Sequence, residues 1–179
     1  MIDTTVKVAD KLVGEYDIIP NPWIKEIHNE NQELVSVEFH GITKIRSNAF
    51  NGCANLALTS LPAGVTSIGD SAFYHCTNLA LTSLPEGLTS IGAGAFYNCT
   101  SLALTSLPEG LTTISFSAFQ DCTGLTSITF KGTPTTIESS AFSGCTNLTE
   151  IKVPWSEGAV SGAPWGATNA TITYNYVGE

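Results

Sequence analysis

Apolar positions recur along this chain with a period of 23 residues. The large apolar side chains fall into columns that align without gaps across the central units. The isoleucine column holds Ile45, Ile68, Ile91, Ile114 and Ile137, and the phenylalanine column, always preceded by alanine, holds Phe50, Phe73, Phe96, Phe119 and Phe142. A fixed period of this size is typical of a solenoid, in which each coil buries its apolar face against its neighbours.

Each unit predicts the same short elements. In residues 102–122 the run LTSL predicts a strand, the Pro108-Glu109-Gly110 sequence a turn, and LTTI a second extended stretch. The Ser-Ala-Phe-x-x-Cys segment has apolar residues at i, i+1 and i+4, which predicts one helical or 3₁₀ turn. The pattern therefore predicts a strand-rich coil with short helical or 3₁₀ turns.

The ends of the chain keep the same phase with altered residues, as capping units do. Adding 23 to Ile137, Phe142, Cys145, Ile151 and Val153 predicts the equivalents Val160, Trp165, Thr168, Tyr174 and Tyr176. We therefore divide one continuous domain into an N-terminal cap (1–33), a repeat array (34–154) and a degenerate C-terminal capping repeat (155–179).

Composition and charge exclude several classes of protein. An apolar fraction of 42% excludes a disordered chain, and no stretch reaches the roughly 18 to 20 apolar residues of a membrane span, so we expect no membrane insertion. The net charge is −9, and no Lys or Arg occurs between Arg46 and Lys131, so nucleic acid is not an expected partner. The first residues lack the apolar segment of a signal peptide.

The five cysteines, Cys53, Cys76, Cys99, Cys122 and Cys145, share one phase beside the phenylalanine column. Equivalent atoms in adjacent coils lie about 4.8 Å apart where strands pair, so distance alone does not forbid disulfides. The odd count and the shared apolar surroundings favour a buried, reduced ladder, with disulfides as the alternative. No Cys-x-x-Cys sequence occurs, so we expect no zinc and no other cofactor.

No arrangement of residues indicates catalysis. His28, His40 and His75 are scattered, and His75 occupies a variable position before Cys76, which favours a surface substitution. No Ser-His-Asp order, paired carboxylates or glycine-rich phosphate loop is present. We predict that the protein is not an enzyme; a deep pocket with convergent ionisable groups would reverse this prediction.

Two sets of residues are candidates for binding. The first lies on the strand face and consists of Leu58, Leu81 and Leu104, with Ser60, Ser83 and Ser106 two residues later. If Thr59 and its equivalents point inward, the leucines form an exposed apolar stripe; if the strands are bulged, the leucines belong to the core. The second set is Tyr74 and Tyr97, adjacent in two coils, which either fill ordinary surface or contact a partner.

The unit LxxLPEGLTSIGxxAFxxCTxL resembles the BspA-type leucine-rich repeat, also called the Treponema pallidum type, over about residues 34 to 176. This family occurs in surface proteins of gut and oral bacteria and of some protists. The resemblance implies an α/β leucine-rich-repeat solenoid, a curved right-handed coil. The chain departs from the family at Thr59, Thr82 and Thr105, where Ile or Leu is usual.

The resemblance implies a non-catalytic, adhesion-type binding module for a protein or glycan, on the cell surface or secreted, and we expect a monomer. The alternative is a structural spacer or an assembly component of a surface layer or phage particle. An exposed leucine stripe would favour binding, because a sheet of repeated side chains offers an extended recognition face. A uniformly Ser/Thr face would favour the spacer.

Overall fold

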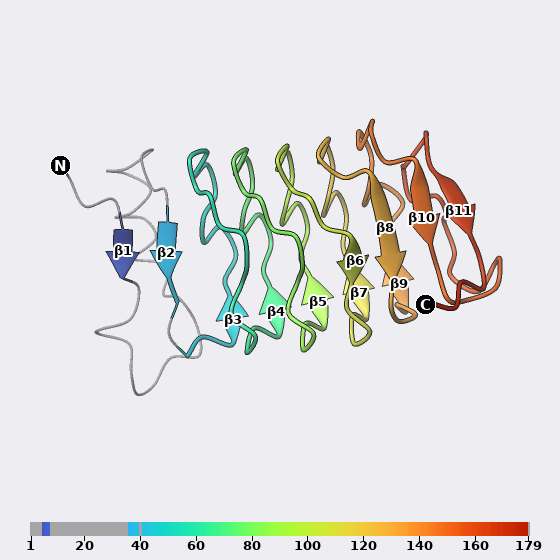
Figure 1. Ribbon diagram of the computed structural model, residues 1–179, viewed down its shortest axis with the longest axis horizontal. Coiled ribbons are helices and arrows are strands. Elements are labelled where there is room, and N and C mark those ends of the chain that lie inside the picture. Colours follow the sequence, from blue (N-terminus) through green and yellow to red (C-terminus); the bar gives the residue numbers. More distant parts are fainter. Residues whose placement is uncertain (1–4, 8–35, 40, 179) are drawn as a thin grey trace.

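The computed structural model of the chain describes residues 5–7, 36–39 and 41–178, which form a strand-rich solenoid. Residues 23 apart lie side by side in adjacent coils, and the coils follow one another along the long axis of the molecule (Figure 1). The solenoid and its period, predicted from the apolar columns, are confirmed. The hand and curvature of the coil stay predictions.

A five-stranded parallel sheet follows one side of the coils. Its strands, in order, are β3 (Lys44–Ile45), β4 (Ser67–Ile68), β5 (Ser90–Ile91), β7 (Thr113–Ile114) and β9 (Thr136–Ile137). Their isoleucines are buried in register, while the residues before them face outward. One position earlier, threonine hydroxyls donate to the carbonyl 23 residues back at 2.9 to 3.1 Å, at Thr66, Thr89, Thr112 and Thr135. Side chains thus extend the backbone ladder.

A second parallel sheet occupies only the C-terminal half of the solenoid (Figure 1). It consists of β6 (Ser106–Leu107), β8 (Ser127–Phe130), β10 (Glu150–Lys152) and β11 (Thr171–Thr173), in the order β11-β10-β8-β6. At the other end, β1 (Thr5–Lys7) pairs with β2 (Ser36–Glu38). The rest of the expected N-terminal cap lies outside the described residues.

Leu58, Leu81 and Leu104 lie in the core, with exposed fractions of 9%, 0% and 2%. The hypothesis that they form an exposed apolar stripe is therefore wrong, and the bulged alternative is correct. Thr59, Thr82 and Thr105 are exposed instead. Burying a leucine rather than leaving it in water is favourable by roughly 1.5 to 3 kcal/mol, whereas a buried threonine hydroxyl needs a partner.

The bulge is visible as a break in the alternation of inward and outward residues. After Leu81 the chain carries two consecutive exposed residues, Thr82 and Ser83, before the buried Leu84. Strand β8, by contrast, alternates between half-buried and buried positions. The amide of Ala80 also donates to the carbonyl of Leu58, 22 residues earlier, whereas the ladder amides of Thr129 and Lys131 donate to carbonyls 24 residues earlier. A local displacement of the chain therefore brings leucine inside in these units.

The segment between the first sheet and each cysteine turns without forming a helix; no helix occurs in the described part of the chain. From Ala72 to Cys76, alternate amides donate to the carbonyl three residues earlier, and from Ser71 to His75 the intervening amides donate to the next coil at 2.7 to 2.8 Å. Because half of the donors bond between coils, a helical ladder is not formed. The expected helical turn is thus a series of single turns tied to the neighbouring coil.

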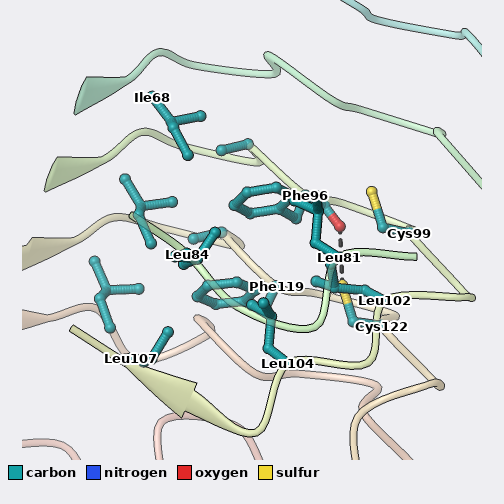
Figure 2. Close-up of a cluster of buried hydrophobic side chains, with 14 of the residues drawn as sticks. Ile68, Leu81, Leu84, Phe96, Cys99, Leu102, Leu104, Leu107, Phe119 and Cys122 are labelled. Carbon is teal, nitrogen blue, oxygen red and sulfur yellow. Dashed lines mark hydrogen bonds between the residues drawn. The ribbon is translucent and has the colours of Figure 1, made fainter. Parts of the chain in front are cut away.

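Phenylalanine rings and cysteine thiols form two ladders through the core. From Phe50 to Phe142 the ring centroids are 5.2 to 5.4 Å apart, with interplanar angles of 4° to 12°. The cysteines are all free and buried, as the reduced-ladder prediction requires. Figure 2 shows the thiol of Cys122 donating to the carbonyl of Phe96 in the preceding coil, at 2.9 Å.

Two tryptophans close the C-terminal end of the core. Trp155 and Trp165 are buried, with ring centroids 6.3 Å apart, and both pack near Phe130. Val160 and Trp165 are buried as predicted. The constant 23-residue offset is wrong beyond them, because Ile151 pairs with Ile172.

The buried residues of the last coil follow this shorter offset. Ala167 is buried while Thr168 is exposed, and Tyr174 and Tyr176 are half-buried. The last coil is therefore shorter than the others.

Candidate binding site on the turn side of the coils

The outer surface beside the bulged leucines carries hydroxyl groups. Ser60 and Ser83 are exposed, Ser106 is half-buried, and Thr59, Thr82 and Thr105 lie next to them. Further along, the outward residues of β8 are Ser127 and Thr129. The structure therefore places the three predicted serines on the surface without the apolar stripe that was expected to accompany them. This face has hydrogen-bonding capacity but no aromatic or aliphatic anchor.

Tyr74 and Tyr97 form an aromatic pair on the turn side of the solenoid, which is the side formed by the turn segments between the first sheet and the cysteines. Their ring centroids are 4.7 Å apart, the rings lie 13° from parallel, and both side chains are half-buried. His75 contacts both rings, at centroid distances of 4.5 Å to Tyr74 and 5.6 Å to Tyr97. The same column carries the smaller Asn51 and Gln120 on either side, so the pair is the aromatic centre of this surface.

Polar groups surround the tyrosine pair and are linked to it. The side-chain nitrogen of Asn98 lies 2.8 Å from Nδ1 of His75. The hydroxyl of Tyr97 hydrogen-bonds to the carboxylate of Asp121, and this bond, together with the nearby negative charge, raises the pKa of Tyr97. We call Tyr74, His75, Tyr97, Asn98 and Asp121 the tyrosine patch. It combines two aromatic rings with an imidazole, an amide and a carboxylate.

The backbone sets the direction of the polar side chains in the tyrosine patch. His75, Asn98 and Asp121 occupy the same position in three successive coils, with φ values of 58°, 56° and 59°. His, Asn and Asp are the non-glycine residues most often found in this left-handed region. Gly52 and Gly144 occupy the position in the outer coils, also with positive φ. The repeat therefore requires a special residue here, and the central coils use polar ones.

A second feature is a hollow on the five-stranded sheet. It encloses about 530 Å³ over β3, β4 and β5. Lys44 and Arg46 lie at the β3 end, and Ser47, Ser67, Ser90, Ser115 and Asp70 supply the other polar side chains. A Cβ atom at Gly92 would come within 2.5 Å of the amide nitrogen of Asp70, so the coils approach closely and the floor of the hollow has no side chain there.

The described surface carries two groups of side chains that can bind a ligand. Within the described ranges, no group of three or more His, Cys, Asp or Glu side chains could hold a metal ion. The same residues include no helix long and apolar enough to cross a membrane. The hollow brings together two cations and hydroxyls, and the tyrosine patch brings together aromatic and hydrogen-bonding groups. Either arrangement can hold a polar ligand by contact.

Sequence reasoning identified Tyr74 and Tyr97 but missed their polar neighbours. The prediction that His75 is a surface residue is confirmed, because His75 is exposed, but the column that it shares with Asn98 and Asp121 was not linked to the tyrosines. A preference for His, Asn, Asp and Gly at one repeat position is a recognisable signal of positive φ. The cations of the hollow carried no such signal, because only the coil geometry brings Lys44 and Arg46 beside Asp70 and the serines.

Comparisons with known proteins agree with this architecture. The profile of the BspA type leucine rich repeat region matches residues 29–160 in six copies. A leucine-rich repeat protein from Bacteroides ovatus ATCC 8483 is 31% identical, with a TM-score of 0.58 over 68% of this chain and 32% of that one. A leucine rich repeat protein of T. pallidum is 26% identical, with a TM-score of 0.52 over 66% of this chain and 72% of that one.

The chain thus spans about a third of the B. ovatus protein, with 32% of that protein covered. No curated protein matches it. The family profile nevertheless covers most of the sequence, including all five phenylalanines and cysteines of the ladders. The period, the core columns and the solved structures lead to one conclusion: this chain belongs to the BspA-type leucine-rich-repeat family.

Proposed function

We propose that the protein is a non-catalytic module of a bacterial surface that binds glycans through the tyrosine patch. The observation that carries the proposal is the stacked pair of Tyr74 and Tyr97 with hydrogen-bonding groups at its sides. Ligand sites commonly combine aromatic side chains with a few well-placed polar groups. The surface location rests on membership of a family found in surface proteins.

The size and chemistry of the patch suit a saccharide better than a protein. A protein complex of standard size takes about 800 Å² from each partner, and the patch centres on only two rings. The negative face of an aromatic ring attracts the C–H groups on the flat side of a sugar ring. Asn98 and Asp121 can exchange hydrogen bonds with sugar hydroxyls. The patch therefore provides both kinds of contact that a short glycan needs.

The alternative function, a structural spacer, is favoured by a different observation. The strand face carries Thr59, Ser60, Thr82 and Ser83 as exposed residues, and the leucines beside them are buried. Over these coils the hydroxyl surface has no anchor of the kind that dominates protein interfaces, and the outward residues on β10 are the paired Glu150 and Lys152. Under this alternative, neither the strand face nor the tyrosine patch has a ligand.

A glycan array tests the proposal. The chain is applied to O-glycans released from gastric mucin and to oligosaccharides from bacterial and plant polysaccharides. We expect binding to at least one saccharide class, and a loss of about tenfold or more in the Tyr74→Ala/Tyr97→Ala variant, because aromatic contacts contribute on the order of 1 to 3 kcal/mol each in comparable stacking sites.

Ser143→Ala is the matched control, since Ser143 occupies the same column two coils beyond Tyr97. It should bind as the unchanged chain does. The melting temperatures of all variants show whether the fold survives. An array without any bound saccharide, or equal binding by the double variant, would refute the tyrosine patch as a glycan site and favour the spacer.

A further inference from the structure

The hollow on the five-stranded sheet has an unusual balance of charge. Lys131 and Lys152 pair with Glu86 and Glu150, at 2.6 and 3.2 Å. Neither Lys44 nor Arg46 forms an ion pair with any of the described residues. Both lie at one end of the hollow, in a protein whose net charge is −9. Two cations that have no ion-pair partner among the described residues create a local attraction for anions.

The one acid in the hollow already has a structural role. Oδ1 of Asp70 accepts a hydrogen bond from the amide of Ala93 at 2.8 Å, which joins two adjacent coils. Its charge still opposes an anion in the hollow. The hydrogen bond from the amide of Ala93 needs only an acceptor oxygen, so an asparagine side chain at position 70 would keep this hydrogen bond and remove the charge.

The lining of the hollow favours a saccharide over an acidic peptide. Its backbone is already paired within the sheet through β3, β4 and β5, so a peptide cannot add a strand to this face. Four serines line it, and Ile45, Ile68 and Ile91, which also line it, have their side chains buried in the core. Hydroxyls and a backbone floor match the hydroxyl groups of a sugar.

We propose that this hollow is a second binding site, distinct from the tyrosine patch, for an anionic saccharide whose carboxylate or sulfate group lies against Lys44 and Arg46. The sugar hydroxyls then meet the serines of β4 and β5 and the backbone at Gly69 and Gly92. Arg46 can bind a carboxylate or sulfate through two parallel hydrogen bonds, and Lys44 acts as a point charge. This site does not depend on the proposed role of Tyr74 and Tyr97.

Calorimetry with the full chain tests the site. The probes are trigalacturonic acid for carboxylates, a heparin tetrasaccharide for sulfates, and fully methyl-esterified trigalacturonate as a neutral match. We expect at least one anionic probe to bind, the neutral ester to bind at least tenfold more weakly, and affinity to fall as salt screens the charges. The preferred probe shows whether the anion is a carboxylate or a sulfate.

Three variants locate the anion. Lys44→Gln/Arg46→Gln should weaken binding at least tenfold, whereas Lys131→Gln/Lys152→Gln, which removes the same charge elsewhere, should change it less than twofold. Asp70→Asn should tighten binding about threefold, because it removes a repulsive charge from the lining of the same hollow. Circular dichroism checks that each variant remains folded.

Several results would overturn the proposal. The first is that neither anionic probe binds. The second is that Lys44→Gln/Arg46→Gln and Lys131→Gln/Lys152→Gln lose affinity equally, and the third is that binding is unchanged or weaker after Asp70→Asn. Equal binding of hexaglutamate would assign the hollow to acidic peptides instead. Binding that survives in the Tyr74→Ala/Tyr97→Ala variant separates this site from the tyrosine patch.

Discussion

Cysteine occupies a position that uses both its size and its hydrogen-bonding group. The carbonyl of Phe96 accepts the amide of Cys99 in its own coil and the thiol of Cys122 in the next coil. The same thiol bond recurs from Cys76 to Cys145, at 2.9 to 3.0 Å. A small apolar side chain with one weak donor fits this site. The thiol ladder therefore ties each coil to the one before it.

Burial favours the neutral thiol at each of these cysteines. It raises the pKa of Cys53 to about 11 and of Cys99 and Cys145 to about 12. In the unfolded chain a thiol ionises near pH 8.5. The native state therefore holds these protons at a pH where the unfolded chain has lost them. This contribution to stability is complete below about pH 8.5 and is lost as the pH rises toward 11 to 12.

The prediction at the residue scale concerns alkaline stability. We expect the free energy of unfolding to fall between pH 9 and pH 11. In Cys99→Ala the slope of this fall should be smaller by about 1.4 kcal/mol per pH unit, because one proton fewer is released on unfolding. Urea denaturation across this range measures the slope. Val65→Ala, a buried change without a thiol, should keep the original slope. Equal slopes for both variants and the unchanged chain would contradict buried, protonated thiols.

At the level of the secondary-structure element, the bulge shows that burial of leucine outweighs regular strand alternation. The repeat period places Leu79 and Leu84 in the core. Between them, either Leu81 or Thr82 can point inward, and it is Leu81 that is buried. Strand β8 has Ser127 at the position equivalent to Leu81 and Ile128 at the position equivalent to Thr82, and it keeps regular alternation. Side-chain hydrophobicity therefore overrides regular strand geometry in the first three units.

Exchanging the two side chains tests this explanation. Leu81→Ser should lower the free energy of unfolding by about 2 to 5 kcal/mol, as expected for a large core side chain. The double variant Leu81→Ser/Thr82→Ile copies the β8 pattern and should lie within about 1.5 kcal/mol of the unchanged chain. Thr82→Ile alone, at an exposed site, should change stability by less than about 0.5 kcal/mol. A double variant as unstable as Leu81→Ser would show that the bulge has another cause.

The columns of the sequence predicted the coil, its core and the phase of the cysteines, because identical residues at identical phase can pack only on one another. They left the position of Leu58, Leu81 and Leu104 open, since period alone does not determine which of two neighbouring residues points inward. The helical or 3₁₀ turn is not confirmed: alternate amides bond to the carbonyl three residues earlier, but the intervening amides bond between coils, and such bonds have no signature in one unit.

On the scale of the whole molecule, the potential binding surfaces lie away from the bulged strand face. The tyrosine patch lies on the turn side, and the hollow with Lys44 and Arg46 lies on the five-stranded sheet. A coil that presents several faces along its length can carry separate contacts on each. The repeated residues form the framework, and the residues that differ between repeats, two tyrosines and two cations, form the proposed binding sites.

Chemical-shift mapping tests the glycan-binding claim most directly. The ¹⁵N-labelled chain is titrated with O-glycans released from gastric mucin, and the amide signals are followed. We expect shifts concentrated at Tyr74, His75, Tyr97 and Asn98, and their loss in the Tyr74→Ala/Tyr97→Ala variant. Shifts concentrated at Thr59, Thr82 and Thr105, or no shifts at all, would contradict it.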